Sequence, residues 1–126
     1  MATITTSYDS TSLRARIIII NWTADASGVS YNLPDNFMAS VAKWYLYQVI
    51  TTPDLSNPPS SYDLKLFFNG DTTYDLLGSA GSGRSATNTE TITPPSYLHM
   101  INSLSLSISS SAGDGKKGQV KLIFIK

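Results

Sequence analysis

The sequence contains no cysteine, a single histidine (His99) and a single glutamate (Glu90) in 126 residues. The absence of cysteine excludes disulfide scaffolds, thiolate zinc sites and cysteine nucleophiles. One histidine excludes the metal-binding motifs that require two. We therefore expect neither a metal nor another cofactor. The scarcity of glutamate and glutamine removes residues that helices prefer.

Charge is also scarce, because only 14% of the residues are charged and nine basic residues balance nine acidic ones. A protein that binds nucleic acid through its phosphates needs a surplus of lysine and arginine, so we expect no nucleic-acid partner. The longest purely aliphatic run, Ile17 to Ile20, is too short to cross a membrane. The start of the chain lacks the pattern of a secretory signal.

The chain is instead rich in serine (19) and threonine (13), and 41% of its residues are hydrophobic. That length and composition fit one domain with a core. Residues 1–12 are weakly patterned and predict an extended N-terminal arm, with a short strand around Ile4 as one alternative, which leaves 13–126 for the domain. Apolar alternation and β-branched residues predict eight strands. These strands are 13–22, 29–33, 42–51, 62–68, 71–77, 87–93, 103–109 and 119–125.

Short connections support this pattern. Asn69-Gly70 is the preferred turn of a two-residue hairpin and predicts that 62–68 pairs with 71–77. One helical turn is predicted at 37–41, and residues 97–101 are expected to form a short turn or helix. Eight short strands without a long helix predict an all-β fold, an antiparallel β-sandwich, with an eight-stranded jelly roll as one candidate.

Two strands carry further information. Four consecutive isoleucines, Ile17 to Ile20, predict burial on both faces of their strand, since side chains alternate between the faces. In 103–109, Leu104, Leu106 and Ile108 alternate with four serines. One face of this strand is expected to contact the core, and the other to face water or a partner.

Two segments suggest enzyme chemistry but lack its requirements. Residues 78–85 resemble a phosphate-binding P-loop, which needs a lysine at the position of Arg84 and a helix after it. The residues that follow favour a strand, so a loop between strands is expected. His99 is a candidate base, but no serine lies in a Gly-x-Ser-x-Gly motif. We expect no catalytic residues and no enzymatic activity.

The remaining polar and aromatic groups have simple structural explanations. The aspartates lie mostly at expected turns, where their side chains bond nearby backbone groups. Trp44, Tyr45 and Tyr47 on one strand are candidates for a sugar-stacking platform, although burial on both faces of the strand explains them more simply. A carbohydrate-binding β-sandwich module is therefore an alternative function.

Several short motifs, in their order along the chain, resemble small virion proteins of tailed bacteriophages. The motifs are Trp22 to Gly28, Tyr62 to Leu66, Asp75 to Gly78, Asn88 to Glu90 and Gly118 to Phe124. The resemblance implies a capsid cement (decoration) protein, a small β-sandwich that binds the major capsid protein and stabilises the shell. A phage tail or head–tail connector component is the alternative that it leaves open.

This resemblance also implies a location and partners. The protein would be made in the host cytoplasm and would lie on the outer capsid surface of the virion, as a homodimer or another homo-oligomer. The N-terminal arm would contact a neighbouring molecule, and Arg84 would pair with an acid there. The expected interface residues are Thr3, Ile4, Thr5, Tyr8 and Arg84.

Overall fold

The computed structural model describes residues 2–11, 15–68, 71–95, 98–99 and 103–126. Within them the chain forms nine strands, one short α-helix and one 3-10 turn, which confirms the all-β antiparallel sandwich. The elements are β1 (Thr3–Thr11), β2 (Ala15–Thr23), β3 (Val29–Asn32), α1 (Asp35–Ser40), β4 (Tyr45–Pro53), β5 (Leu64–Phe68), β6 (Glu90–Ile92), β7 (Leu98–His99), β8 (Leu104–Ile108), η1 (Ser110–Ala112) and β9 (Lys117–Ile125).

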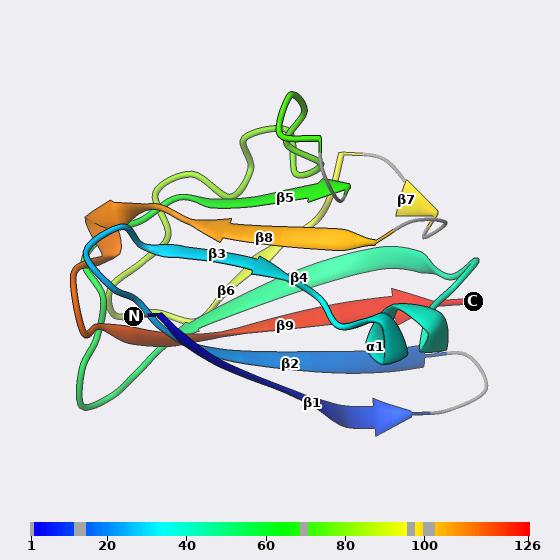
Figure 1. The fold of residues 1–126 in the computed structure, drawn as a ribbon, viewed down its shortest axis with the longest axis horizontal. Helices are drawn as coiled ribbons and strands as arrows, with labels where there is room; N and C mark the ends of the chain where they lie inside the picture. Colours follow the sequence, from blue (N-terminus) through cyan, green and yellow to red (C-terminus); the bar gives the residue numbers. More distant parts are fainter. Residues whose placement is uncertain (1, 12–14, 69–70, 96–97, 100–102) are drawn as a thin grey trace.

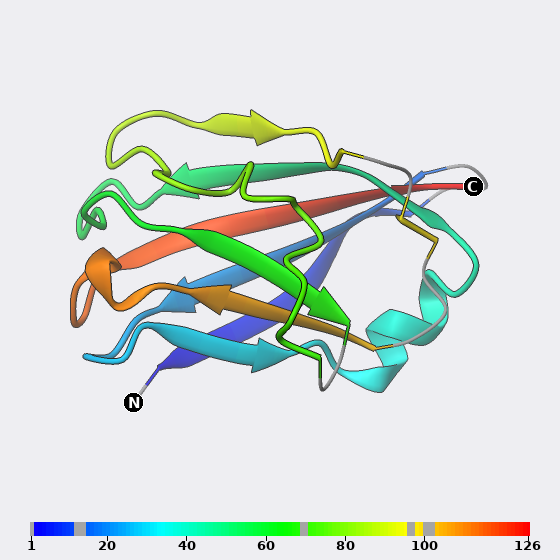
Figure 2. The same cartoon turned by 90° about the horizontal axis from the view of Figure 1, so that it is seen from above.

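The strands form two layers, one of six strands and one of three. The larger sheet has the order β1-β2-β9-β4-β6, with β7 also paired to β4, and it is the lower layer in Figure 1. The smaller sheet has the order β3-β8-β5 and covers one side of the larger sheet, as the view from above also shows (Figure 2). All strand pairs are antiparallel.

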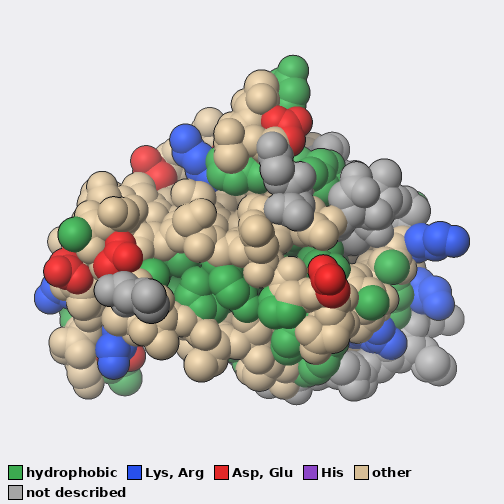
Figure 3. Space-filling view, in the orientation of Figure 1, with side chains coloured by type: hydrophobic (Ala, Val, Ile, Leu, Met, Phe, Trp, Pro, Cys, Tyr) green, Lys and Arg blue, Asp and Glu red, His purple; other side chains and the backbone are tan. Residues whose placement is uncertain are grey.

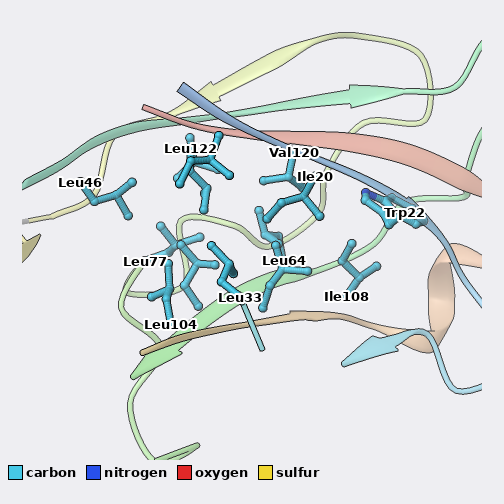
Figure 4. Packing of buried hydrophobic residues seen from close by; sticks show 14 of the residues in the cluster. Ile20, Trp22, Leu33, Leu46, Leu64, Leu77, Leu104, Ile108, Val120 and Leu122 are labelled. Carbon is cyan, nitrogen blue, oxygen red and sulfur yellow. The ribbon is translucent and has the colours of Figure 1, made fainter. Parts of the chain in front are cut away.

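The core fills the space between the two sheets (Figure 4). Trp22 and Tyr62 are the largest fully buried side chains in it, and their rings meet edge to face with centroids 5.3 Å apart. The Trp22 indole also lies against Gly118 of the neighbouring strand, where a Cβ would come within 2.5 Å of the ring. Glycine is therefore required at this position of β9 so that the indole can pack under the sheet.

The predicted N-terminal arm is instead a strand of the larger sheet. β1 pairs with β2 from Thr3, opposite Thr23, to Thr11, opposite Arg16, with a bulge between Tyr8 and Ser10. The alternating Ile4 and Thr6 face the core side, where the Thr6 hydroxyl bonds the Tyr31 hydroxyl of the other sheet. The Ser/Thr-rich composition concealed this strand because Thr6 interrupts the apolar alternation even in its inner row.

The segment 71–77, predicted as a strand, is a loop that folds back beside β5. Its organiser is Asp75, whose carboxylate accepts hydrogen bonds from the backbone N–H groups of Leu66, Leu77 and Ser79. The Asp75 carboxylate thus accepts the hydrogen bond that the Leu66 N–H would give to the backbone of a paired strand in a hairpin. Asn69 and Gly70, the expected turn, lie outside the described residues.

Other boundaries shift by a few residues. Of the predicted strand 87–93, only Glu90–Ile92 is a strand, because Ser85 and Glu90 side chains bond the backbone before it. The helix begins at Asp35, with Pro34 as its N-cap and without a side-chain cap. In the region 97–101, Leu98–His99 forms the short strand β7, and its neighbours lie outside the described residues.

Candidate functional site

The outer face of the smaller sheet carries an ordered array of small polar side chains. In β8 the odd-numbered serines point away from the core, while Leu104, Leu106 and Ile108 are buried. The strand register extends this polar row across the sheet in two lines. These lines are Ser30–Ser107–Lys65 and Asn32–Ser105–Phe67, each with one residue from β3, β8 and β5.

These lines surround a hollow of about 300 Å³. Hydroxyl, amide and aromatic groups line it together, from Ser30, Asn32, Ser107, Phe67 and Thr72. Adjacent strands lie ~4.8 Å apart, so three neighbouring side chains offer a row of polar groups ~10 Å long. Because the lining residues carry no formal charge, this hollow suits a neutral polar ligand.

One hydrogen bond fixes the central part of the array. The Ser105 hydroxyl donates to the side-chain oxygen of Asn32 over 2.6 Å, from the middle strand to the edge strand. This bond uses only the amide oxygen, so the amide nitrogen of Asn32 keeps two N–H donors for a ligand. The array therefore presents both donors and acceptors in fixed positions.

Phe67 forms the apolar wall of the hollow. It belongs to the outward row of β5, yet it is only 9% exposed, and Thr72 of the loop after β5 lines the same hollow. That loop is held to the strand by the backbone bond from Leu76 to Leu66 and by the Asp75 carboxylate. The aromatic wall is thus supported by a fixed loop and needs little ordering when a ligand binds.

The residues predicted as an interface do not form one surface. Thr3 and Thr5 lie exposed on the outer side of β1, whereas Ile4 packs against the core. Tyr8 is 41% exposed, and its ring lies 4.7 Å from that of Phe37 in α1. These side chains therefore divide between opposite sides of one edge strand.

Arg84 is occupied within the chain. Its guanidinium lies 3.7 Å from the Glu90 carboxylate, and its backbone forms an isolated bridge with Tyr62. Glu90 also accepts a bond from the backbone of Ser85, so this pair fixes the 78–90 loop. The segment 78–85 is a series of turns and no helix follows it, in agreement with the predicted inter-strand loop.

The candidate aromatic platform is divided by burial. Trp44 is only 6% exposed, with the Arg16 guanidinium 4.6 Å and the Lys126 ammonium 5.8 Å from its ring centroid. Tyr45 and Tyr47 are 38% and 42% exposed. A bulge between Leu46 and Gln48 makes Tyr47 an extra residue in the strand. Trp44 is thus a packing residue, and the platform as predicted does not exist.

Most of the aspartates bond backbone groups, as predicted. Asp25, Asp54, Asp63, Asp71 and Asp75 each accept at least one backbone N–H. In the part of the chain that the structure describes, no three acidic, histidine or cysteine side chains gather where they could hold a metal ion. The described helices include none long and apolar enough to cross a membrane. The side chain of His99 lies outside the described residues.

Sequence reasoning identified part of this site. It assigned the serines of 103–109 to a face that meets water or a partner, and the structure places Ser105 and Ser107 at the centre of the array. It missed Asn32 and Phe67, because the register of β3 and β5 against β8 brings them together and a single sequence does not give that register. The alternation of 62–68 is the one signal that sets Phe67 apart from the inward row.

Comparisons with known proteins found similarity only among solved structures. No family model matches the chain, and no curated protein matches it. The CBM22-1 xylan-binding domain of Paenibacillus barcinonensis Xyn10C is 14% identical, with 98% of this chain and 79% of that chain covered and a TM-score of 0.44. The low-affinity xylan-binding module CBM86 from Roseburia intestinalis is 13% identical, with 100% and 95% covered and a TM-score of 0.38.

A third structure is the C-terminal family 22 carbohydrate-binding module of Clostridium thermocellum Xyn10B. It is 14% identical, with 98% of this chain and 79% of that chain covered and a TM-score of 0.33. These structures are described as carbohydrate-binding modules, and none is described as a phage protein. This finding contradicts the prediction of a capsid cement protein. That prediction, with its alternative of a phage tail or connector component, is wrong.

Proposed function

We propose that this protein is a non-catalytic carbohydrate-binding module that holds a neutral polysaccharide on the outer face of its smaller sheet. The observation that carries the proposal is the uncharged array around Asn32, Ser107 and Phe67, which combines fixed hydroxyl and amide groups with an aromatic wall. A sugar ring presents hydroxyl groups at its edge and C–H groups on its faces, and such an array offers a partner for each.

The polar contacts would orient the ligand. Asn32 offers its two amide donors, and Ser30 and Ser107 offer hydroxyls that both donate and accept. Binding sites for small polar ligands combine a few placed polar groups with apolar walls in this way. The apolar wall is the small exposed part of Phe67, which can contact C–H groups of a sugar.

The lack of charge selects among polysaccharides. The residues that line the hollow are uncharged, and the one charged side chain in the two polar lines is Lys65, at the edge of the sheet in β5. We therefore expect neutral polymers to bind. An acidic polymer such as polygalacturonate should gain little affinity from its charge. Replacement Lys65→Ala should leave the affinity for a neutral chain within about twofold.

Residue-resolved NMR titration tests the proposal on the isolated chain. Xylohexaose, cellohexaose and mannohexaose are added to the ¹⁵N-labelled protein, and retention on the parent insoluble polysaccharides is measured in parallel. We expect at least one probe to shift the amide signals of Ser30, Asn32, Ser105 and Ser107. No retention and no shift with any of the three probes would contradict the proposal.

Matched variants separate binding from folding. Asn32→Ala and Ser107→Ala should each weaken binding at this face by about tenfold, the effect of losing one or two hydrogen bonds. Phe67→Leu should weaken it similarly because the ring is lost, whereas Phe67→Tyr keeps the ring and should retain binding. Thr91→Ala, at an exposed position of β6, is the control and should bind as the wild type does.

A further inference from the structure

The outer face of the larger sheet carries two neighbouring hollows, of about 290 and 200 Å³. They share Asn21, Asp54 and Gly118, so they form one continuous depression across the sheet. Thr3 and Thr5 border it on the β1 side, and Thr52 and Leu55 border it on the β4 side. The depression lies on the opposite side of the sandwich from the array of the smaller sheet.

The register of four strands places a polar row along the floor. Thr5 is opposite Asn21, Asn21 is opposite Gln119, and Gln119 is opposite Thr52. Three intervals of ~4.8 Å give this row a length of ~14 Å. The hydroxyl of Thr89 donates to that of Thr52 over 3.3 Å and extends the row towards β6.

The two amides at the centre of the row are oriented by each other. The Gln119 amide nitrogen donates to the Asn21 side-chain oxygen over 3.0 Å. This bond leaves one N–H and the oxygen of Gln119, together with both N–H groups of Asn21, as donors and acceptors for a ligand. The pair is therefore set in position before a ligand arrives.

A fixed loop forms the wall of the depression. The Asp54 carboxylate accepts bonds from the backbone of Ser56 and Asn57, and two backbone bonds join Asp54 and Asn57 to Lys117 of β9. This anchoring holds up Leu55, whose side chain is 99% exposed. An apolar group thus stands beside the polar floor, as Phe67 does on the smaller sheet.

The charges at the depression balance. Asp54 and Lys117 both line it, so one acidic and one basic group accompany the neutral row. An anionic or cationic polymer therefore finds one repulsive group for each attractive one, while a neutral chain of hydroxyl groups can bond both. This balance favours the same ligand class as the neutral array of the smaller sheet.

We propose that this depression is a second polysaccharide-binding track, so that one molecule holds two separate neutral chains on opposite faces. The inference rests on the proposed function, because it assigns the same ligand class to a second surface. The two tracks lie on opposite sides of a rigid sandwich, and a module that occupies both would cross-link polymer chains. Cross-linking would add avidity without any new contact.

The test uses the complete chain and the hexasaccharide that gives the strongest response in the NMR titration. We expect calorimetry to give two molecules bound per protein and NMR to show perturbed amides at both Ser107 and Gln119. A solution of a soluble polysaccharide should become turbid when the wild-type protein is mixed with it. Asn21→Ala combined with Gln119→Ala should reduce the stoichiometry to one and abolish the turbidity.

Two controls separate the second track from the first and from folding. Ser7→Ala alters an exposed residue on the same side of β1 as Thr5, away from the depression, and should keep both binding events. Asn32→Ala should weaken only the event at the smaller sheet. Melting temperatures of all variants within a few degrees of the wild type show that the fold is intact.

Each alternative result has a distinct meaning. One binding event that is lost with Asn32→Ala and unaffected by the double variant would overturn the second track and leave the proposed function standing. One event that depends only on Asn21 and Gln119 would overturn both the two-track inference and the assignment to the smaller sheet. Failure of every probe to bind would contradict the proposed function itself.

Discussion

Two antiparallel strands, β8 in the smaller sheet and β2 in the larger, differ in their outward rows. In β8 the inward residues are leucine and isoleucine and the outward ones are serine. In β2 both rows are isoleucine near the start of the strand, and Ile18 and Ile20 are fully buried while Ile17 and Ile19 are partly exposed. The prediction that all four isoleucines are buried was right for the inward pair alone.

The difference shows what alternation determines. It assigns each residue to a side of its strand, but the nature of the outer surface depends on the neighbouring strands. Ile17 and Ile19 lie opposite Ile123 and Lys121 of β9, so the larger sheet has an outward row that is partly apolar. The smaller sheet has outward serine and asparagine side chains on β3 and β8, and its surface can bind a polar ligand.

Figure 3 shows a related contrast at the open side of the sandwich. The visible surface is mostly uncharged, and hydrophobic side chains gather in a band between the layers. Basic side chains appear at both ends of the view, and acidic ones appear towards the left end, at the top and right of the centre. Charges of both signs are thus scattered over this side of the molecule.

The largest expected effect tests whether the two inward rows are equivalent. Leu106→Ala and Ile18→Ala each remove a fully buried side chain and should each lower the free energy of unfolding by about 3 kcal/mol. Urea denaturation followed by tryptophan fluorescence measures this. Ser107→Ala, next to Leu106 but outward, should cost less than about 0.5 kcal/mol. Equal losses of unfolding free energy for Leu106→Ala and Ser107→Ala would contradict the assignment of these residues to an inward and an outward row.

The second effect concerns Tyr62, which joins the two sheets through its contact with Trp22. Burial raises the pKa of Tyr62 to about 12, although a hydrogen bond with Thr51 and the charge of Arg84 act in the opposite direction. The folded protein therefore retains the phenol proton at a pH where the unfolded chain, with a tyrosine pKa near 10, has lost it.

Stability should consequently be constant with respect to this group below pH 10 and fall as the pH rises from 10 to 12. The total loss is about 2 to 3 kcal/mol, which corresponds to two pKa units. Denaturation curves at pH 9, 10 and 11 measure the first half of this loss, about 1.4 kcal/mol by pH 11. Tyr62→Phe should remove this part of the alkaline loss, and an unchanged alkaline loss in the variant would contradict the assignment to Tyr62.

A third, smaller effect tests the loop that supports the binding array. Asp75→Asn replaces one accepting oxygen by an amide nitrogen where Leu66, Leu77 and Ser79 donate, and should cost about 1 to 2 kcal/mol. Hydrogen exchange at Leu66 should accelerate. Asp71→Asn is the control, because that carboxylate is fully exposed and bonds only Thr73 nearby. Equal effects of the two substitutions would contradict the special role of Asp75.

The smallest effect compares the outward rows themselves. Ile19→Ala removes a partly exposed side chain and should cost about 1 kcal/mol, roughly a third of the cost of Ile18→Ala. The same denaturation measurement applies, with Ser107→Ala as the reference for an outward position. If Ile19→Ala lowers the free energy of unfolding as much as Ile18→Ala does, the outer face of the larger sheet is as well packed as its inner face.

Sequence patterns gave most strands because alternation is a local property. The strands at 103–109 and 119–125 were predicted to within two residues at each end, and the prediction of a sandwich followed from their number and spacing. The patterns failed where polar side chains replace backbone partners. Asp75 turns an expected strand into a loop, and a mostly polar composition conceals β1.

The candidate site was less accessible to sequence reasoning. The serines of β8 were visible, but their neighbours Asn32 and Phe67 lie far away in the chain and meet them only through the sheet order β3-β8-β5. The aromatic residues that seemed most suited to sugars included Trp44, which the fold buries. Hydrophobic size alone does not distinguish a packing residue from a binding one.

The arrangement of β1, β2 and β9 also has a mechanical consequence. β1 begins beside Thr23, and β9 ends beside Ala15, at the other end of the same central strand (Figure 1). Tension applied between Thr3 and Ile125 therefore acts along the strands and perpendicular to their hydrogen bonds. Both ladders are loaded in shear, with all bonds sharing the force, and do not open one bond at a time like a zipper.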